Sequence, residues 1–524
     1  METQNDLESI RWRKYYDNSE FHLDYPRETM YEAVKRICRI YPEYTAIDFM
    51  GGKVSYRELY GKICEVAAAF SAAGIGKRDV VTLNLPNIPQ AVYCIYALNK
   101  IGAVPSMIHP LSAETEILRY LEISESKAVV VTDMFYAKTA EAVLQYKLRT
   151  GNTVRIIIAS IADELNFPKN IVYNIMNRRN TPKIRCGENV LLWRNFIGEG
   201  KSTPLNESGG VENSGDAAVI LYSGGTTGTS KGIVLTDGNI NAVAAQTLAA
   251  SGFLSVAGDK MLSIMPVFHG FGLGIGIHLP LVSGACCILV PRFSVKTYAN
   301  LIKRKKPNFI PGVPTIFEAL LRAEGLEKTD LSFLKGVFSG GDSLSPELKK
   351  KVDAFLKAHN AKVQIREGYG TTECVTASCL TPPAYSREGS IGLPFPDTYF
   401  AIIKVGTTEH LPYGEEGEIC LRGPTVMSGY LGNPEETAQT LRTHDDGNVW
   451  LHTGDLGFMD EDGFVYFRQR IKRMIVTSGY NVYPSRVENV IDGYPKVQMS
   501  CVIGVKDAYK MHRVKAFVML KQGV

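Results

Sequence analysis

Helical and strand-like hydrophobic patterns alternate through residues 28–170, and this alternation constrains the fold more than any other feature. The stretch from Ser55 to Ile75 has apolar residues at helical spacing, and Ser55 with Glu58 forms a capping box at its start. The runs DVVTLNLPN, KAVVVTD and TVRIIIAS are apolar and β-branched, which is typical of buried strands. Strands separated by helices imply parallel sheets with helices packed outside. The same alternation returns in residues 301–356, so we expect a large α/β domain made of two parallel α/β subdomains.

The pattern changes after about residue 390, where short strands alternate with Gly and Asp turns. Such a pattern favours antiparallel strands, and we expect a small distorted β-barrel with MDEDG, residues 459–463, as a hairpin turn. The last stretch holds one helix candidate and two strand candidates. We therefore predict a large domain over residues 1–469 and a small α+β C-terminal domain over residues 470–524.

Composition and charge exclude several classes of protein. A net charge of +4 over 524 residues argues against a dedicated nucleic-acid binder, which carries a concentrated basic face. The uncharged segment from Met261 to Val290 contains Pro266, Pro280 and many glycines, so we expect buried core and no transmembrane segment. The ten cysteines form no C-x-x-C pair and the N-terminus has no apolar signal sequence. Buried reduced thiols in a cytoplasmic protein are the expectation.

The stretch YSGGTTGTSKG, Tyr222 to Gly232, raises the question of phosphate binding. The spacing G-x-x-x-x-G-K-[ST] is absent, because Lys231 lies between Ser230 and Gly232. An apolar strand pattern precedes the stretch and a helical pattern follows it, and a glycine-rich turn between strand and helix suits phosphate. Several hydroxyl side chains could act as donors: Thr226, Thr227, Thr229 and Ser230. From these residues alone, a phosphate loop and a polar linker remain equally open.

Four further motifs follow the glycine loop in a fixed order. They are SGGD (339–342), GYGTTE (368–373), HTGDLG (452–457) and RQRIKRMIVTSGYNVYPSRVE (468–488). Together with the loop they resemble the adenylate-forming (ANL) superfamily, and most of all its medium- and long-chain fatty acyl-CoA synthetases. The resemblance extends from near residue 28 to the end of the sequence. Ser230 stands where the superfamily commonly has proline, a mild departure that keeps the hydroxyls and the lysine.

The resemblance implies a reaction in two steps on one site. A carboxylate attacks the α-phosphorus of ATP, giving acyl-adenylate and pyrophosphate, and a thiol, usually that of coenzyme A, then displaces AMP. Mg²⁺ is the implied metal, with Glu373 as its ligand. The implied triphosphate contacts are Thr226, Thr227, Gly228, Ser230 and Lys231, with Thr372 near the α-phosphate. Taken without the resemblance, a lone Glu such as Glu373 is more often a solvated surface charge.

The remaining implied roles concern the nucleoside, the acid and the hinge. Tyr369 would stack on adenine and Asp455 would accept hydrogen bonds from the ribose, although core packing and a simple turn are the ordinary roles of such residues. His269 would line the carboxylate site, although a lone histidine in an apolar run is more often a core residue. Lys472 resembles the hinge position between the two domains. Further residues are implied in nucleotide binding: Gly341, Asp342, Gly370 and Arg470.

The substrate is expected to be a hydrophobic acid. An amino-acid-activating domain would carry an Asp for the substrate amine near FHGFGLG, and only apolar and small residues are found there. The small residues from Gly270 to Gly276 would leave room for a chain. The expected acyl tunnel also includes Val267, Phe268, Phe271, Gly340 and Gly341. Aryl, carnitine-like and bile acids remain open, as do loading of an acyl carrier protein and a nucleotide-binding homologue without catalysis.

One family feature has no counterpart in this sequence. The superfamily carries a lysine on a P-K-T-x-x-G-K-type loop, which stabilises the adenylation transition state. The sequence ends at VKAFVMLKQGV, before that loop, and neither Lys515 nor Lys521 fits the motif. We therefore expect the C-terminal domain to be incomplete here; adenylation would be slow if this were the natural terminus.

Overall fold

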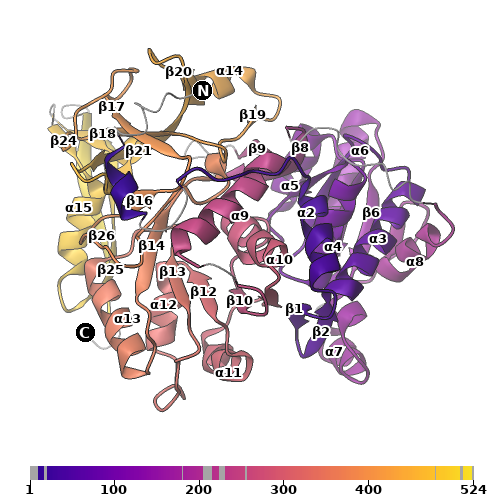
Figure 1. The fold of residues 1–524 in the computed structure, drawn as a ribbon. Helices are drawn as coiled ribbons and strands as arrows, with labels where there is room; N and C mark the ends of the chain where they lie inside the picture. Colours follow the sequence, from indigo (N-terminus) through magenta and orange to yellow (C-terminus); the bar gives the residue numbers. More distant parts are fainter. Residues whose placement is uncertain are drawn as a thin grey trace.

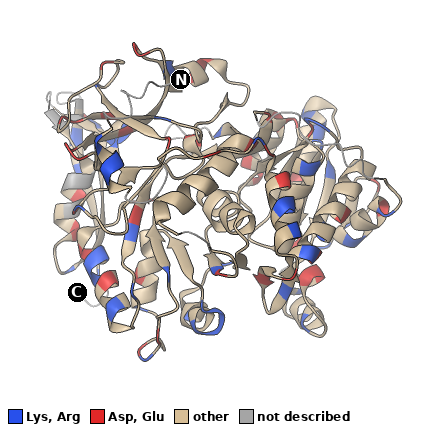
Figure 2. Cartoon of the chain, viewed as in Figure 1, with Lys and Arg blue, Asp and Glu red and all other residues tan. Residues whose placement is uncertain are grey.

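The computed structural model describes most of the chain. The described residues are 10–16, 21–179, 181–204, 215–223, 230–253, 256–477, 480–507 and 511–521. Two large sheets lie side by side with helices around them, and an antiparallel sheet and a small C-terminal unit lie at one end (Figure 1). Acidic and basic residues are mixed over the fold (Figure 2).

The first sheet has eight strands and is parallel over most of its width. In sheet order its strands are β19 (Gly429–Tyr430), β9 (Lys231–Thr236), β8 (Ala217–Ser223), β4 (Val104–Met107), β3 (Val80–Asn84), β5 (Ala128–Thr132), β6 (Arg155–Ala159) and β7 (Val190–Leu192). The pairings β8–β9 and β9–β19 are antiparallel, and the others are parallel.

The second sheet has nine strands with a parallel centre. In sheet order its strands are β16 (Leu393–Pro394), β15 (Cys379–Leu380), β14 (Ile365–Tyr369), β13 (Gly336–Ser339), β12 (Phe309–Gly312), β10 (Lys260–Ser263), β11 (Cys286–Leu289), β1 (Thr45–Phe49) and β2 (Gly52–Ser55). Only β2, β15 and β16 at the two edges are antiparallel to their neighbours. The prediction of two parallel α/β subdomains is confirmed.

Local signals place the helices where the sequence predicts them. The capping box at Ser55 and Glu58 starts α3 (Tyr56–Ala72), and each of its two reciprocal hydrogen bonds is present. The other helices of the large sheets are α2 (Met30–Ile40), α4 (Pro89–Lys100), α5 (Glu114–Ser124), α6 (Tyr136–Thr150), α7 (Lys169–Asn177), α8 (Trp193–Gly200), α9 (Asp237–Ser251), α10 (Leu279–Val282), α11 (Val295–Lys305), α12 (Pro314–Leu321) and α13 (Pro346–Ala358). Short 3-10 turns add η1 (Arg11–Tyr15), η2 (Asp133–Phe135) and η3 (Ile161–Glu164).

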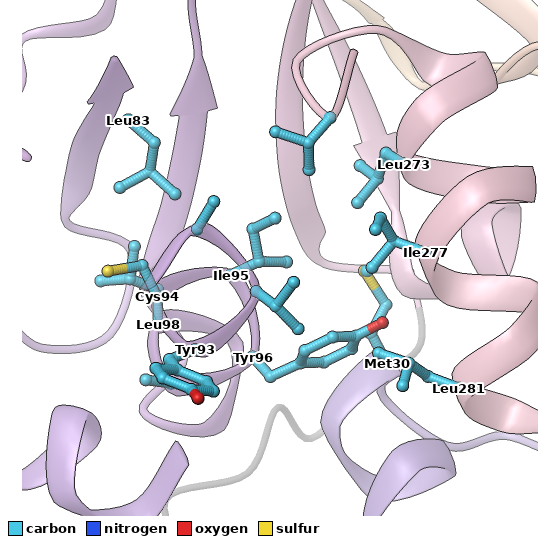
Figure 3. Close-up of a cluster of buried hydrophobic side chains, with 14 of the residues drawn as sticks. Met30, Leu83, Tyr93, Cys94, Ile95, Tyr96, Leu98, Leu273, Ile277 and Leu281 are labelled. Carbon is cyan, nitrogen blue, oxygen red and sulfur yellow. The ribbon is translucent and has the colours of Figure 1, made fainter. Parts of the chain in front are cut away.

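Helix α4 joins the two sheets into one core. All of its residues are buried, as expected for a helix that is apolar on nearly every side. Tyr96 on α4 points toward Ile277 and Leu281 of the facing helices, whereas Leu83 of β3 lies on the other side (Figure 3). On the side of Tyr96, helix α4 faces the π-helical segment η4 (Phe271–His278), which continues into α10. Most of the stretch from Met261 to Val290 is buried, although His269 within it is exposed. Among the described helices, none has the length and apolar character of a membrane span.

The third unit is antiparallel, as predicted. In chain order its strands are β17 (Tyr399–Ile403), β18 (Gly417–Arg422), β20 (Leu441–Thr443), β21 (Val449–Met459) and β22 (Val465–Arg470), with α14 (Pro434–Thr440) beside them. The MDEDG turn joins β21 to β22, whose residues Met459 and Val465 pair. The small unit that follows contains η6 (Ile471–Arg473), β23 (Ile475–Thr477), β24 (Tyr480–Val482), α15 (Pro484–Asp492), β25 (Val497–Asp507) and β26 (Met511–Leu520).

One local expectation at the glycine loop is wrong. The sequence suggested a strand, a glycine turn and then a helix, but a second strand, β9, lies between the loop and α9. Residues Ser223 of β8 and Lys231 of β9 are paired across an antiparallel ladder. The loop therefore connects two antiparallel strands, β8 and β9, rather than a strand and a helix. Lys231 is the first residue of the returning strand, so the sheet fixes its backbone.

Candidate active site

A polar cleft lies between the second large sheet, the antiparallel sheet and the small C-terminal unit. Its walls come from the loop after β13, the carboxyl end of β14, the β21–β22 hairpin, α15 and β25. The carboxyl ends of neighbouring parallel strands are where open α/β sheets bind ligands. Six residues predicted from the sequence line this cleft together: Gly341, Asp342, Tyr369, Gly370, Asp455 and Arg470.

Asp455 is the buried centre of this cleft. Its side chain is only 1% exposed, and its Oδ2 accepts a 2.6 Å hydrogen bond from the Tyr369 hydroxyl. Nε of Arg470 lies 3.0 Å from Oδ1 of Asp455, but this ion-pair contact lacks hydrogen-bond geometry, and within the described chain Oδ1 has no hydrogen-bond partner. Burial raises the pKa of Asp455 to about 6, and the Arg470 guanidinium partly opposes that rise. A buried carboxylate oxygen with unused accepting capacity fits a ligand hydroxyl.

A second centre surrounds Glu373 on the turn η5 (Thr372–Cys374). The hydroxyl of Tyr430 donates a 3.0 Å hydrogen bond to Oε1 of Glu373. Nζ of Lys231 lies 4.8 Å from the centre of the Tyr430 ring and forms an ion pair with Glu436. Strand β19 pairs with β9 and so brings Tyr430 beside Lys231. The Tyr430 phenol therefore contacts the half-buried carboxylate of Glu373 through its hydroxyl and the ammonium of Lys231 through its ring.

The donor set at Glu373 fits Mg²⁺. This ion commonly takes one or two carboxylates, with the other positions filled by water and substrate phosphate oxygens. Glu373 offers one carboxylate, and the nearby ammonium of Lys231 suits the phosphates that would share the ion. Thr372 precedes it at the start of η5 and is half-buried.

The two centres are parts of one segment. Tyr369 ends β14 and Glu373 follows on η5, so the same turn supplies a group to each centre. Gly370 lies between them, where a Cβ atom would come within 1.9 Å of the Thr376 carbonyl oxygen. Only glycine allows this close backbone approach. This segment therefore links the contacts of Lys231 and Glu373 to those of Tyr369 and Asp455, and the roles of these residues stay predictions.

Part of the predicted phosphate loop lies outside the described residues, namely Thr226, Thr227, Gly228 and Thr229. Ser230 is described, and its Oγ accepts a 3.2 Å hydrogen bond from the Tyr120 hydroxyl. Lys472 lies exposed on η6, directly after the last strand of the antiparallel sheet. Its role as a hinge stays a prediction.

An apolar pocket adjoins the polar cleft. Phe271, Ile275, Phe338 and Leu380 line it, and part of its wall is shared with the cleft. Both cavities are bounded by the same four residues: Gly341, Gly368, Tyr369 and Gly370. An apolar chain placed in the pocket would therefore present its polar end where the cleft begins.

The expected acyl-tunnel residues divide into two groups. Phe271, Gly340 and Gly341 line the pocket as predicted, whereas Val267 is fully buried in the core. The expectation that glycines 270 and 272 make room for a chain is wrong. A Cβ at Gly270 would lie 1.6 Å from the Val375 carbonyl oxygen, and these glycines serve close backbone packing instead.

His269 lies two residues before Phe271, which lines the pocket. Its ring is exposed to solvent yet surrounded by protein atoms, as on the wall of a concave surface, and this desolvation lowers the pKa of the imidazole. Its Nδ1 accepts a 3.3 Å hydrogen bond from the Phe271 backbone N–H. His269 is therefore an exposed residue rather than a core histidine, and its role beside the carboxylate stays a prediction.

Sequence reasoning missed a buried hydrogen-bond network that supports Asp455. His452 bonds through Nδ1 to Oε2 of Glu418 at 2.9 Å, and Oε1 of Glu418 accepts the Gly454 backbone N–H at 2.9 Å. On its other side His452 contacts His444, 3.0 Å away between Nε2 atoms. Glu418 thereby fixes the residue next to Asp455. Residues 418 and 452 are far apart in sequence, and only the register of β18 and β21 brings them together, so no local pattern could have revealed them.

We expect Glu418→Ala to weaken adenosine binding about tenfold and to lower the free energy of unfolding by about 2 kcal/mol, because it leaves buried donors without an acceptor. Isothermal titration and urea unfolding measure the two effects. His410→Ala, at the outer end of the same histidine chain, is the matched control and should change adenosine affinity little. Unchanged adenosine affinity in Glu418→Ala would contradict the positioning role.

One other group could offer ligands to a metal ion. Among the described residues, Glu418, Cys420 and His452 are buried with their ligand atoms within 4.8 Å of one another. Both ring nitrogens of His452 are already engaged, by Glu418 and His444. The hydrogen-bond network accounts for this arrangement without an ion.

Solved structures of known proteins have the same architecture as this chain. The crystal structure of ATP-bound MatB from Rhodopseudomonas palustris superimposes with a TM-score of 0.77 and 26% identity, covering 94% of this chain and 89% of that one. The class of this fold is the adenylate-forming (ANL) superfamily, with two sheets that have parallel centres, an antiparallel sheet and a small C-terminal unit.

Comparison of the amino-acid sequence with known families and relatives identifies the family. The chain belongs to the AMP-binding enzyme family, whose profile matches residues 34–431. It is 35% identical over 522 residues to the long-chain-fatty-acid–CoA ligase of Bacillus subtilis (strain 168), covering 98% of this chain and 89% of the relative. It is also 30% identical over 460 residues to the probable 4-coumarate–CoA ligase 1 of Dictyostelium discoideum, covering 87% and 79%.

Proposed function

We propose that this protein activates a hydrophobic carboxylic acid, of medium or long chain, with ATP and transfers the acyl group to coenzyme A. The carboxylate attacks the α-phosphorus of ATP and pyrophosphate leaves. The thiol of coenzyme A then attacks the acyl carbon and AMP leaves. The observation that carries this proposal is the shared wall of Gly341, Gly368, Tyr369 and Gly370, which joins an apolar pocket to a polar cleft. A CoA ligase for long-chain fatty acids among its relatives supports the same substrate class.

The residues of the cleft take separate parts of the nucleotide in this proposal. The Tyr369 ring packs against adenine, and Oδ1 of Asp455 accepts from a ribose hydroxyl. Lys231 directs its charge to the β- and γ-phosphates, with the hydroxyls of Thr226 and Thr227 on the adjoining loop. The donors and the cation hold charge that develops on phosphate oxygens in the transition state.

Three further groups complete the proposed site. Glu373 is the residue that would hold Mg²⁺, which when bound neutralises charge on the transferring phosphates. His269 is proposed to orient the acid carboxylate. Lys472 is proposed as the hinge about which the C-terminal unit turns between the two steps. We place the protein in the cytoplasm, which its ten free cysteines support.

Acid-dependent exchange of pyrophosphate into ATP tests the first step. The assay uses the full chain as the enzyme. It compares fatty acids of graded length, a coumarate and a bile acid as substrates. Exchange with medium or long fatty acids supports the proposal, and its absence with every acid would overturn it. Release of AMP on adding coenzyme A identifies the acceptor. Release only with a phosphopantetheinyl carrier protein would instead favour the carrier-loading alternative.

Gly340→Val is expected to shift the preference toward shorter acids, with at least a tenfold loss of kcat/KM for the longest, because the side chain would fill the pocket. A Cβ at Gly340 meets its nearest atom, the Gly368 carbonyl oxygen, at 3.4 Å, so the substitution strains the backbone little. Exchange rates across the acid series measure the shift. An equal loss for all chain lengths would mean that Gly340 does not line the acyl site.

A further inference from the structure

Helix α7 presents its apolar side to solvent. Ile171, Val172, Ile175 and Met176 are spaced so that they form one stripe, and they are 48%, 51%, 69% and 75% exposed. Phe167, just before the helix, is 78% exposed. None of the residues of α7 is buried. This is the reverse of the usual arrangement, in which the apolar stripe of a surface helix faces the core.

The opposite side of α7 attaches it to the protein. Asn170, Tyr173 and Asn177 recur at helical spacing and are the half-buried residues of the helix. The Tyr173 hydroxyl lies 4.0 Å from the sulfur of Met134, and Lys169 donates a 3.4 Å hydrogen bond to the Met50 carbonyl. The polar side is therefore held against the protein, and the apolar side stays outward.

Basic residues surround the stripe. Between Asn166 and Gly187 the sequence has five basic and no acidic residues. All five are exposed: Lys169, Arg178, Arg179, Lys183 and Arg185. The whole chain carries a net charge of only +4, so this segment is a local concentration of positive charge.

The helix is remote from the active site. Figure 1 shows α7 at the lower margin of the molecule, below β2 and on the side away from the C-terminal unit. No residue of α7 lines the cleft or the apolar pocket. The stripe therefore needs a separate explanation.

We propose that α7 and its basic flank dock the protein on the surface of an anionic lipid bilayer. A helix with an exposed apolar face and Lys and Arg beside it lies in the interface, with the face among the acyl chains and the cations near the headgroups. Charge complementarity selects an anionic bilayer over a neutral one. No described helix could span a membrane, so the association is peripheral. This inference is independent of the proposed function.

Sedimentation with vesicles tests the proposal on the full chain. Vesicles of phosphatidylcholine alone are compared with vesicles that also contain about one third phosphatidylglycerol. Both are tested at low and at high salt. We expect binding to the anionic vesicles, weakened by salt. The double variant Ile175→Asp/Met176→Asp should lower the partition coefficient at least about tenfold. Its circular dichroism and pyrophosphate exchange without vesicles should match those of the unmodified protein.

A matched control lies on α6. Leu144 and Leu148 are also exposed, 49% and 71%, at the same spacing of four residues. There Arg149 is paired with Glu122, so the basic surround is partly neutralised. Leu144→Asp/Leu148→Asp should bind anionic vesicles like the unmodified protein.

Three results would overturn the proposal. The first is no binding of the unmodified protein to anionic vesicles. The second is equal loss of binding in the α6 and α7 variants, or no loss in the α7 variant. The third concerns a protein partner: if sedimentation equilibrium shows a dimer that Ile175→Asp/Met176→Asp dissociates, the stripe is an interface between copies of this chain.

Discussion

Replacing Lys231 with alanine should slow acid-dependent pyrophosphate exchange by about 100-fold, because a fixed cation facing the triphosphate is lost where charge develops. The backbone of Lys231 is held in β9 and paired with Ser223, so the fold should survive the substitution. The ion pair with Glu436 is partly exposed, 18% and 31%, and contributes at most about 1 kcal/mol to stability. Exchange rates at saturating acid, together with a thermal melt, separate the catalytic effect from unfolding.

Glu436→Gln is the matched control for this variant. It removes the same ion pair but keeps the ammonium of Lys231. In the unmodified protein Glu436 would compete with an incoming phosphate for that ammonium. We expect exchange at or above the rate of the unmodified protein, with a lower KM for ATP. If Glu436→Gln lost as much activity as Lys231→Ala, the ion pair itself would be the important interaction, and the phosphate role of Lys231 would be wrong.

The sequence was most informative where the signal is local. The capping box at Ser55 and Glu58 lies within four residues, and the helix begins where it predicts. Helix α4 is composed mostly of apolar residues, and all of its residues are buried. In each case the residues that determine the element are also the residues that form it, so tertiary context changes little.

Strand β9 was missed because its pairing is tertiary. The residues KGIVLT form a short apolar run directly after the glycine loop, and they read equally well as the approach to α9. Their partners are β8 on one side and β19, about two hundred residues later, on the other. The same limit hid Tyr430, whose importance comes only from the position of β19 beside Lys231.

Helix α7 shows a different limit. Its apolar residues recur at helical spacing, and that pattern alone predicts an inward stripe. The spacing specifies the face but not the direction in which the face points. Contacts of Tyr173 and Lys169 determine the direction, and these depend on chain segments that are distant in sequence.

Adenosine should bind about tenfold more weakly at pH 5 than at pH 7, because protonation of Asp455 removes the negative charge that strengthens its hydrogen bond from the ribose. Burial raises the pKa of this carboxyl from its ordinary value to about 6. The carboxylate therefore predominates above that pH, and the neutral acid accumulates as the pH falls through it. Adenosine is the suitable probe because it lacks the phosphates of ATP, which titrate in the same range. Competition by adenosine against a fluorescent nucleotide gives the affinity at each pH.

Asp455→Asn decides whether this carboxyl is the group that titrates. The amide keeps the shape of the side chain but carries no charge, so its affinity for adenosine should be lower at pH 7 and flat between pH 5 and 7. Glu367, whose pKa burial raises to about 7, also lines the cleft, and any contribution from it would persist in the variant. Asp462→Asn is the control on the same hairpin, because Lys14 already holds the pKa of Asp462 below its usual value. A profile in Asp455→Asn that still falls tenfold would assign the titration to another group and remove the ribose role from Asp455.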